Sequence, residues 1–175
     1  MYSNVFVFIV SCAAIAFLGC GGDQVKADGD PLPAWFTATP AGCATGVQKF
    51  RGNLSLAKAG SIGKGRTELA RQLQVQVKAM LKQYSSEGGT AKGDFSEEQT
   101  DDVSRQLTDM SLSGTRAVKT HVSQGTTQRF YSLVCVDPEK LADALDKMKE
   151  LDAKARSALK IRAKNAFKEL DRFTN

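Results

Sequence analysis

The apolar positions of the chain change their spacing several times, and each change marks a different element. Between residues 55 and 84 they recur at steps of three and four, which predicts a long helix, capped by Ser55, with one buried face. The positions on that face are Leu69, Leu73, Val77, Met80 and Tyr84. Gly60, Gly63 and Gly65 interrupt the first half. Either a neighbouring element approaches the helix closely there, or the helix begins only near Thr67.

Shorter apolar runs predict a small sheet. Residues 43–51, 115–122 and 127–137 are rich in strand-forming residues, and a four-residue loop joins the last two as a hairpin. The final strand is apolar on both faces, so we expect the long helix on one face and the C-terminal helix or another subunit on the other. Residues 95–110, which open with a capping-box sequence at Ser96, predict a second helix. This pattern predicts an α+β fold in which a small antiparallel sheet packs around a long helix.

A further long helix is predicted from Pro138 nearly to residue 170, with Asp137 as its N-cap. If continuous, it would be about 50 Å long. Its second half is basic, and the candidate interaction residues are Lys160, Arg162, Lys164, Lys168 and Arg172. Three interpretations stay open: a solvated helix face, coiled-coil pairing with a second copy, or contact with an acidic surface.

The N-terminal segment has the features of an export signal. An uncharged apolar run from Val5 to Leu18 ends at Gly19 and Cys20, and it is too short to span a bilayer comfortably. This junction predicts a lipoprotein signal peptide over residues 1–19 and lipidation of Cys20. An ordinary cleaved signal or an uncleaved anchor are the alternatives. Because Gly21 rather than Asp follows the cysteine, we expect the outer membrane, with the periplasm as the alternative location.

Composition and cysteine usage fit an exported protein of one domain. The formal net charge of +5 lies entirely outside residues 1–19. Behind an export signal, this basicity favours acidic envelope material over nucleic acid as a partner. The polar residues 20–30 predict a flexible tether. Cys43 and Cys135 are candidates for one disulfide, and the alternative is a pair of small buried thiols.

Signals for catalysis are scarce. His121 is the only histidine, and its place near a strand end favours an exposed polar residue over a general base. Residues 60–67 lack the spacing of a phosphate-binding loop, and the acidic cluster at 97–102 lacks that of a calcium-binding loop. We therefore expect no catalytic residue, no metal and no cofactor. Trp35, in a proline-rich entry segment, is interpreted as a packing anchor.

The order of these features resembles the LPP-twenty family of small bacterial outer-membrane lipoproteins, which includes FlgP-like flagellar lipoproteins. The matching features are Cys20, the Pro33-Ala34-Trp35 entry, a short strand containing Gly46, a helix with Glu68-Leu69-Ala70-Arg71-Gln72, and a strand over residues 131–137. The resemblance covers residues 33–137. It implies an α+β domain linked to envelope structure, motility or host contact, without catalytic residues.

The leading functional hypothesis is a lipid-anchored outer-membrane protein with a non-enzymatic structural or interaction role. Its organisation would be a signal over 1–19, a tether over 20–30, an LPP-twenty-like domain over 31–137 and a basic amphipathic helix over 138–175. Expected partners are the membrane, through the N-terminal lipid, and envelope proteins or a second copy. The alternative is a periplasmic module that contacts peptidoglycan or lipopolysaccharide through its basic C-terminal helix.

Overall fold

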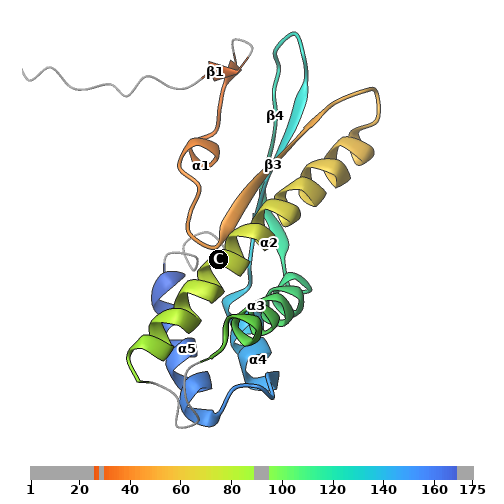
Figure 1. Ribbon diagram of the computed structural model, residues 1–175. Coiled ribbons are helices and arrows are strands. Elements are labelled where there is room, and N and C mark those ends of the chain that lie inside the picture. The colour runs from red at the N-terminus through yellow and green to blue at the C-terminus, as the bar shows by residue number, and fades with distance from the viewer. Residues whose placement is uncertain (1–25, 28–29, 89–94, 169–175) are drawn as a thin grey trace, which may run out of the picture.

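One long helix, α2 (Leu54–Ser86), runs along the molecule, with a sheet against its first half and three further helices gathered beside its second half (Figure 1). This computed structural model describes residues 26–27, 30–88 and 95–168, so Cys20, the predicted signal and Arg172 lie outside the described residues. The predicted α+β class is confirmed. The other elements, in chain order, are β1 (Lys26–Ala27), β2 (Asp30–Pro31), α1 (Ala34–Thr37), β3 (Cys43–Lys49), α3 (Glu97–Leu112), β4 (Arg116–Val122), β5 (Arg129–Cys135), α4 (Pro138–Lys147) and α5 (Ala153–Ala166).

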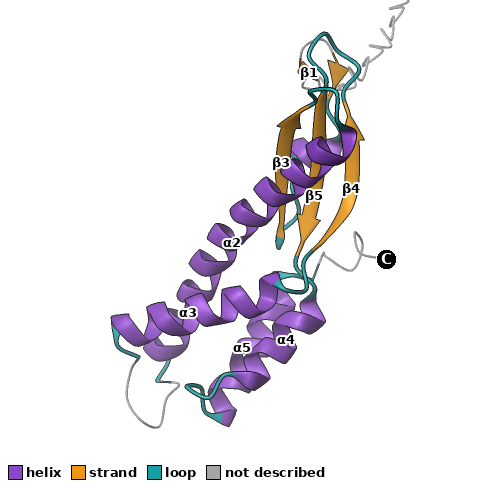
Figure 2. Cartoon of the chain, turned by 90° about the vertical axis from the view of Figure 1, so that its right-hand side faces the viewer, coloured by secondary structure: helices purple, strands orange, loops and turns teal. Residues whose placement is uncertain are grey.

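The main sheet has the strand order β3, β5, β4, and both pairings are antiparallel (Figure 2). Strands β4 and β5 form the predicted hairpin, and β3 pairs along the other edge of β5. In this register Cys43 lies opposite Cys135, and Lys49 lies opposite Arg129. Residues 130–135 of the central strand are all buried, as expected for a strand covered on both faces.

The glycines of α2 are explained by the close approach of the sheet. A Cβ atom on Gly65 would lie 2.8 Å from Cγ2 of Val134 in β5, and one on Gly46 in β3 would collide with the backbone of α2. The helix is therefore continuous through its glycines, and of the two alternatives the close approach of a neighbouring element is correct, not a start near Thr67. Its N-cap is Asn53 rather than the predicted Ser55, because the Asn53 side chain accepts a hydrogen bond from the Leu56 N–H at 3.0 Å.

The second face of the sheet is covered by the entry segment of the chain. The ring of Phe36, in α1, packs edge-on against Tyr131 of β5 with the ring centroids 5.1 Å apart, and Trp35 is half-buried against the core. The expectation that the C-terminal helix or another subunit covers this face is therefore wrong for the part around Tyr131. A short aromatic segment is enough there because the sheet has only three strands.

The second half of α2 joins α3, α4 and α5 in a helical cluster. Helix α3 begins with the predicted capping box, in which the Ser96 hydroxyl and the Gln99 side chain each accept a hydrogen bond from the other residue's N–H at 3.1 Å. The core of the cluster is continuous with that of the sheet. Its buried side chains include Leu73, Val77, Leu81, Val103, Leu107, Leu141, Leu145 and Leu159.

The prediction of one continuous C-terminal helix is wrong. Helix α4 ends at Lys147, and α5 begins after Asp152, whose side chain accepts a hydrogen bond from the Ala155 N–H at 2.7 Å. Met148 and Leu151, in the connection, are both buried. A straight helix of that length would leave much of its apolar stripe without a partner, whereas the break lets α5 pack against both α4 and α2.

Candidate functional site

The break divides the predicted basic residues into two groups with different surroundings. Arg162 faces α2, where its guanidinium pairs with Glu87 and donates to the Met80 carbonyl oxygen at 3.5 Å. The same group lies over the Tyr84 ring, 5.8 Å from the centroid. Arg162 thus fastens α5 to the long helix and is already engaged within the chain.

Lys160 lies on the other side of α5, toward α4. Its ammonium group pairs with the carboxylate of Asp146 near the end of α4. Arg156, one turn earlier, donates to the Asp146 carbonyl oxygen at 3.0 Å. These two contacts hold the helices together at the closed end of the bend between them.

The open end of this helix pair forms a groove of about 430 Å³. Its apolar lining includes the buried residues Leu141, Ala163 and Phe167. Lys160 and Lys164 of α5 and Lys168, two residues after its end, line it at four-residue intervals, and Lys164 and Lys168 are exposed. Glu139 and the start of α4 at Pro138 lie on the other side. Among the described residues, three of the predicted interaction residues, Lys160, Lys164 and Lys168, line this groove.

The apolar stripe proposed for pairing with a second copy is largely used inside the chain. Its buried members are Leu141, Leu145, Met148, Leu151, Ala155, Leu159, Ala163 and Phe167. The described residues therefore leave little of this stripe for a coiled coil. Self-association stays a prediction, and it would have to use another surface.

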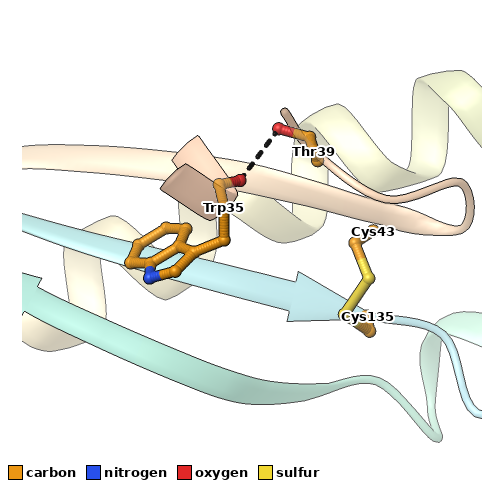
Figure 3. The surroundings of a disulfide bond; sticks show 4 residues. All are labelled: Trp35, Thr39, Cys43 and Cys135. Carbon is orange, nitrogen blue, oxygen red and sulfur yellow. Dashed lines mark hydrogen bonds between the residues drawn. A yellow bond between two sulfur atoms is a disulfide. The ribbon is translucent and has the colours of Figure 1, made fainter. Parts of the chain in front are cut away.

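A disulfide joins Cys43 and Cys135 (Figure 3). The two residues are 92 positions apart in the sequence, are direct partners across β3 and β5, and are 1% and 0% exposed. Trp35 lies nearby, and its carbonyl oxygen accepts a hydrogen bond from the Thr39 hydroxyl at 3.4 Å. The disulfide joins β3 to the central strand, β5, at the part of the sheet that the entry segment covers.

No protein-family model matches this sequence, and no curated protein matches it. The described residues also contain no group of three or more His, Cys, Asp or Glu side chains that could hold a metal ion. Within the same residues, no helix has the length and apolar content needed to cross a bilayer. The groove, the disulfide and the Cys20 junction are thus the grounds for a functional proposal.

The remaining polar features have structural explanations. His121 is half-buried rather than exposed, and its ring lies 5.9 Å from that of Tyr131. Glu68 and Arg71 form an ion pair at 2.7 Å on the surface of α2, and the hydrogen bonds from Arg71 and Gln72 lower the pKa of Glu68 to about 2. Arg66 does not join that pair, since it donates to the Thr115 hydroxyl at 3.2 Å.

Sequence periodicity could not separate Arg162 from its basic neighbours. All of them lie on one predicted helix, and only the packing of α5 against α2 turns Arg162 inward. A signal for the bend was present at Asp152, which is an N-cap residue type placed inside the predicted helix. Arg172 and Cys20 lie outside the described residues.

Proposed function

We propose that this chain is an exported, lipid-anchored protein of the bacterial envelope with a non-enzymatic structural or interaction role. The observation that carries the proposal is the Cys43–Cys135 disulfide. Disulfides persist in oxidising compartments such as the periplasm and are rare in the cytosol. A buried disulfide in the domain and a Cys20 junction after an apolar leader are two separate features that both fit export.

The outer membrane is the proposed location, and the periplasm is the alternative. The resemblance to LPP-twenty lipoproteins supports an envelope role of the FlgP-like kind, in envelope structure or motility. The order of the elements from β3 through the long helix to the hairpin is compatible with the domain that this resemblance implies.

Metabolic labelling with a palmitate analogue tests the anchor. We expect label on the wild-type chain and loss of label in Cys20→Ala. Cys12→Ala, which removes the other cysteine of the N-terminal segment, is the matched control and should keep its label. Label that survives Cys20→Ala would refute the assignment of the lipidated residue. Deletion of the gene, followed by a swimming assay and an outer-membrane permeability assay, then separates a motility role from a structural one.

A second candidate function is favoured by the groove between α4 and α5. Its apolar lining, with lysines along one side, would suit an anionic envelope molecule such as lipopolysaccharide, whose phosphates and acyl chains match the two kinds of surface. Peptidoglycan, with carboxylates but no acyl chains, would use the lysines alone.

Binding to purified lipopolysaccharide and to peptidoglycan sacculi tests this function. The Lys164→Gln/Lys168→Gln double variant should weaken lipopolysaccharide binding about tenfold or more, because each lysine near an anionic surface contributes on the order of 1 kcal/mol. Lys154→Gln, at the exposed start of α5 away from the groove lining, is the matched control. Arg162 is left intact because it fastens the helix. Equal losses in control and double variant would refute a role for the groove.

A further inference from the structure

The two segments that form the main sheet and the start of α2 have no acidic residue, although Asp30 of β2 lies just before the first of them. Residues 31–67 and 110–136 contain eight Lys and Arg and no Asp or Glu. The whole chain has 24 Lys and Arg and 19 Asp and Glu. The eight are Lys49, Arg51, Lys58, Lys64, Arg66, Arg116, Lys119 and Arg129. The fold brings the two segments together, because β3 and the start of α2 pack with β4 and β5. The net charge of +5 is thus concentrated on one half of an elongated molecule.

The far end of this half also exposes apolar side chains. Leu54 and Leu56, in the first turn of α2, are 54% and 69% exposed. Arg51 precedes them and Lys58 follows them, and both are exposed. These four residues, here called the sheet end, combine leucines with cations and lie within eight positions of one another.

The chain reaches the domain at the same end. In both views β1 lies beside the tip of the β4–β5 hairpin, and the start of α2 lies toward the same end of the molecule, which Figure 1 shows on the other side of the sheet (Figures 1 and 2). Cys20 precedes Lys26 by six residues. Six residues span at most about 22 Å even when fully extended. A lipid on Cys20 would therefore hold this end of the molecule within that distance of a bilayer.

We propose that the sheet end docks on the anionic phospholipid surface of the membrane in which Cys20 is anchored. Arg51 and Lys58 are attracted to phosphate headgroups, and Leu54 and Leu56 enter the interface between headgroups and acyl chains. This inference rests on the proposed lipid anchor. Because α2 is about 50 Å long at 1.5 Å per residue, docking by one end would hold the groove between α4 and α5 well away from the membrane.

A fluorescence experiment tests where the molecule touches the bilayer. The mature chain from residue 20 is exported behind a non-lipoprotein signal with Cys20→Ser, so that it forms its disulfide and carries no lipid. An environment-sensitive dye is attached at Leu56→Cys or, as matched control, at Ile161→Cys in α5, which is similarly exposed at 60%. With vesicles of phosphatidylcholine and phosphatidylglycerol, the emission of the dye at position 56 should rise. Lipids that carry a quencher near the headgroup should then quench that emission. An equal response at position 161, or none at 56, would overturn the proposal.

A second arm tests the chemistry of the contact. Arg51→Gln/Lys58→Gln should weaken vesicle binding about tenfold or more, and Leu54→Ser/Leu56→Ser should weaken it similarly. Lys149→Gln/Lys154→Gln, which removes the same charge at exposed positions outside the groove lining, should not change it. Undiminished binding by the Arg51/Lys58 variant, or equal binding to pure phosphatidylcholine, contradicts docking on anionic lipid. These vesicle results do not depend on lipidation, whereas loss of palmitate labelling in cells would refute the anchor alone.

Discussion

Gly46 of β3 lies directly against Ser61 of α2. A Cβ atom on Gly46 would stand 1.8 Å from the Ser61 carbonyl oxygen and 2.5 Å from the backbone nitrogen of Gly65. Both contacts are with backbone atoms, which cannot rotate away as a flexible side chain can. The spacing between the sheet and the long helix is therefore fixed by the absence of a side chain at one strand position.

Gly46→Ala is expected to destabilise the fold by about 3 kcal/mol or more, at the upper end of overpacking costs, because the helix must move off the sheet. Gly63→Ala, in the helix that Gly46 contacts, is the control, since a Cβ there would meet no atom within 4 Å. The control should gain up to about 1 kcal/mol from helix propensity. Urea unfolding measures both changes, and equal effects would contradict the close packing.

Removal of the disulfide should lower the free energy of unfolding. Closing a loop of this length is worth about 4.5 kcal/mol in the chain-entropy model, before any loss to native strain. Reduction, or the Cys43→Ala/Cys135→Ala variant, should shift the denaturant midpoint accordingly, while Cys20→Ser should not. The intact mass should be about 2 Da lower before reduction than after it, and an unchanged mass would mean that the two cysteines are buried thiols.

Arg162→Met should loosen α5 from α2. The variant keeps an apolar stem but removes the contacts with Glu87, the Met80 carbonyl and the Tyr84 ring. Since Glu87 is half-exposed and can be resolvated, the expected cost is about 1 to 2 kcal/mol. Faster amide hydrogen exchange in α5 should accompany it. Lys164→Met, on the exposed side, should cost less than about 0.5 kcal/mol; similar costs for both would show that Arg162 does not fasten the helix.

The Glu68 carboxyl should titrate well below a usual glutamate. Hydrogen bonds from Arg71 and Gln72 favour its charged form and lower its pKa from 4.5 to about 2. Because the folded-state pKa is depressed, its contribution to stability is present above about pH 4.5 and is lost as the pH falls through 2. In an NMR titration, Arg71→Gln should raise the pKa of Glu68 while Arg105→Gln, beside Asp102, leaves it unchanged. A Glu68 midpoint near 4.5 in the wild type would contradict the ion pair.

The pattern of apolar residues predicted most elements because it reflects which face of each segment is buried. The long helix, the hairpin and the Ser96 capping box were all found at or near their observed positions. The same pattern does not say what covers a face. Phe36 covers part of the sheet where a helix or subunit was expected, and the bend before Asp152 was missed because Met148 and Leu151 fit a helical stripe equally well.

In the candidate site, too, the sequence identified the residues but not their contacts. Lys160, Arg162, Lys164 and Lys168 were identified from composition, since a run of cations is visible in any conformation. Their separate roles were not, because an ion pair with Glu87 depends on two segments 75 residues apart. The groove exists only because α5 folds back beside α4.

By itself, the sequence determined the α+β class and the two cysteines that could pair, because periodicity and residue type are local properties. Export stays a prediction from the apolar run and Cys20. Tertiary structure alone decided that Gly46 and Gly65 set the spacing between sheet and helix, that Arg162 is engaged within the chain, and that the two acid-free segments around Arg51 and Arg116 pack together. Those features join residues far apart in the chain, and only packing determines which of them meet.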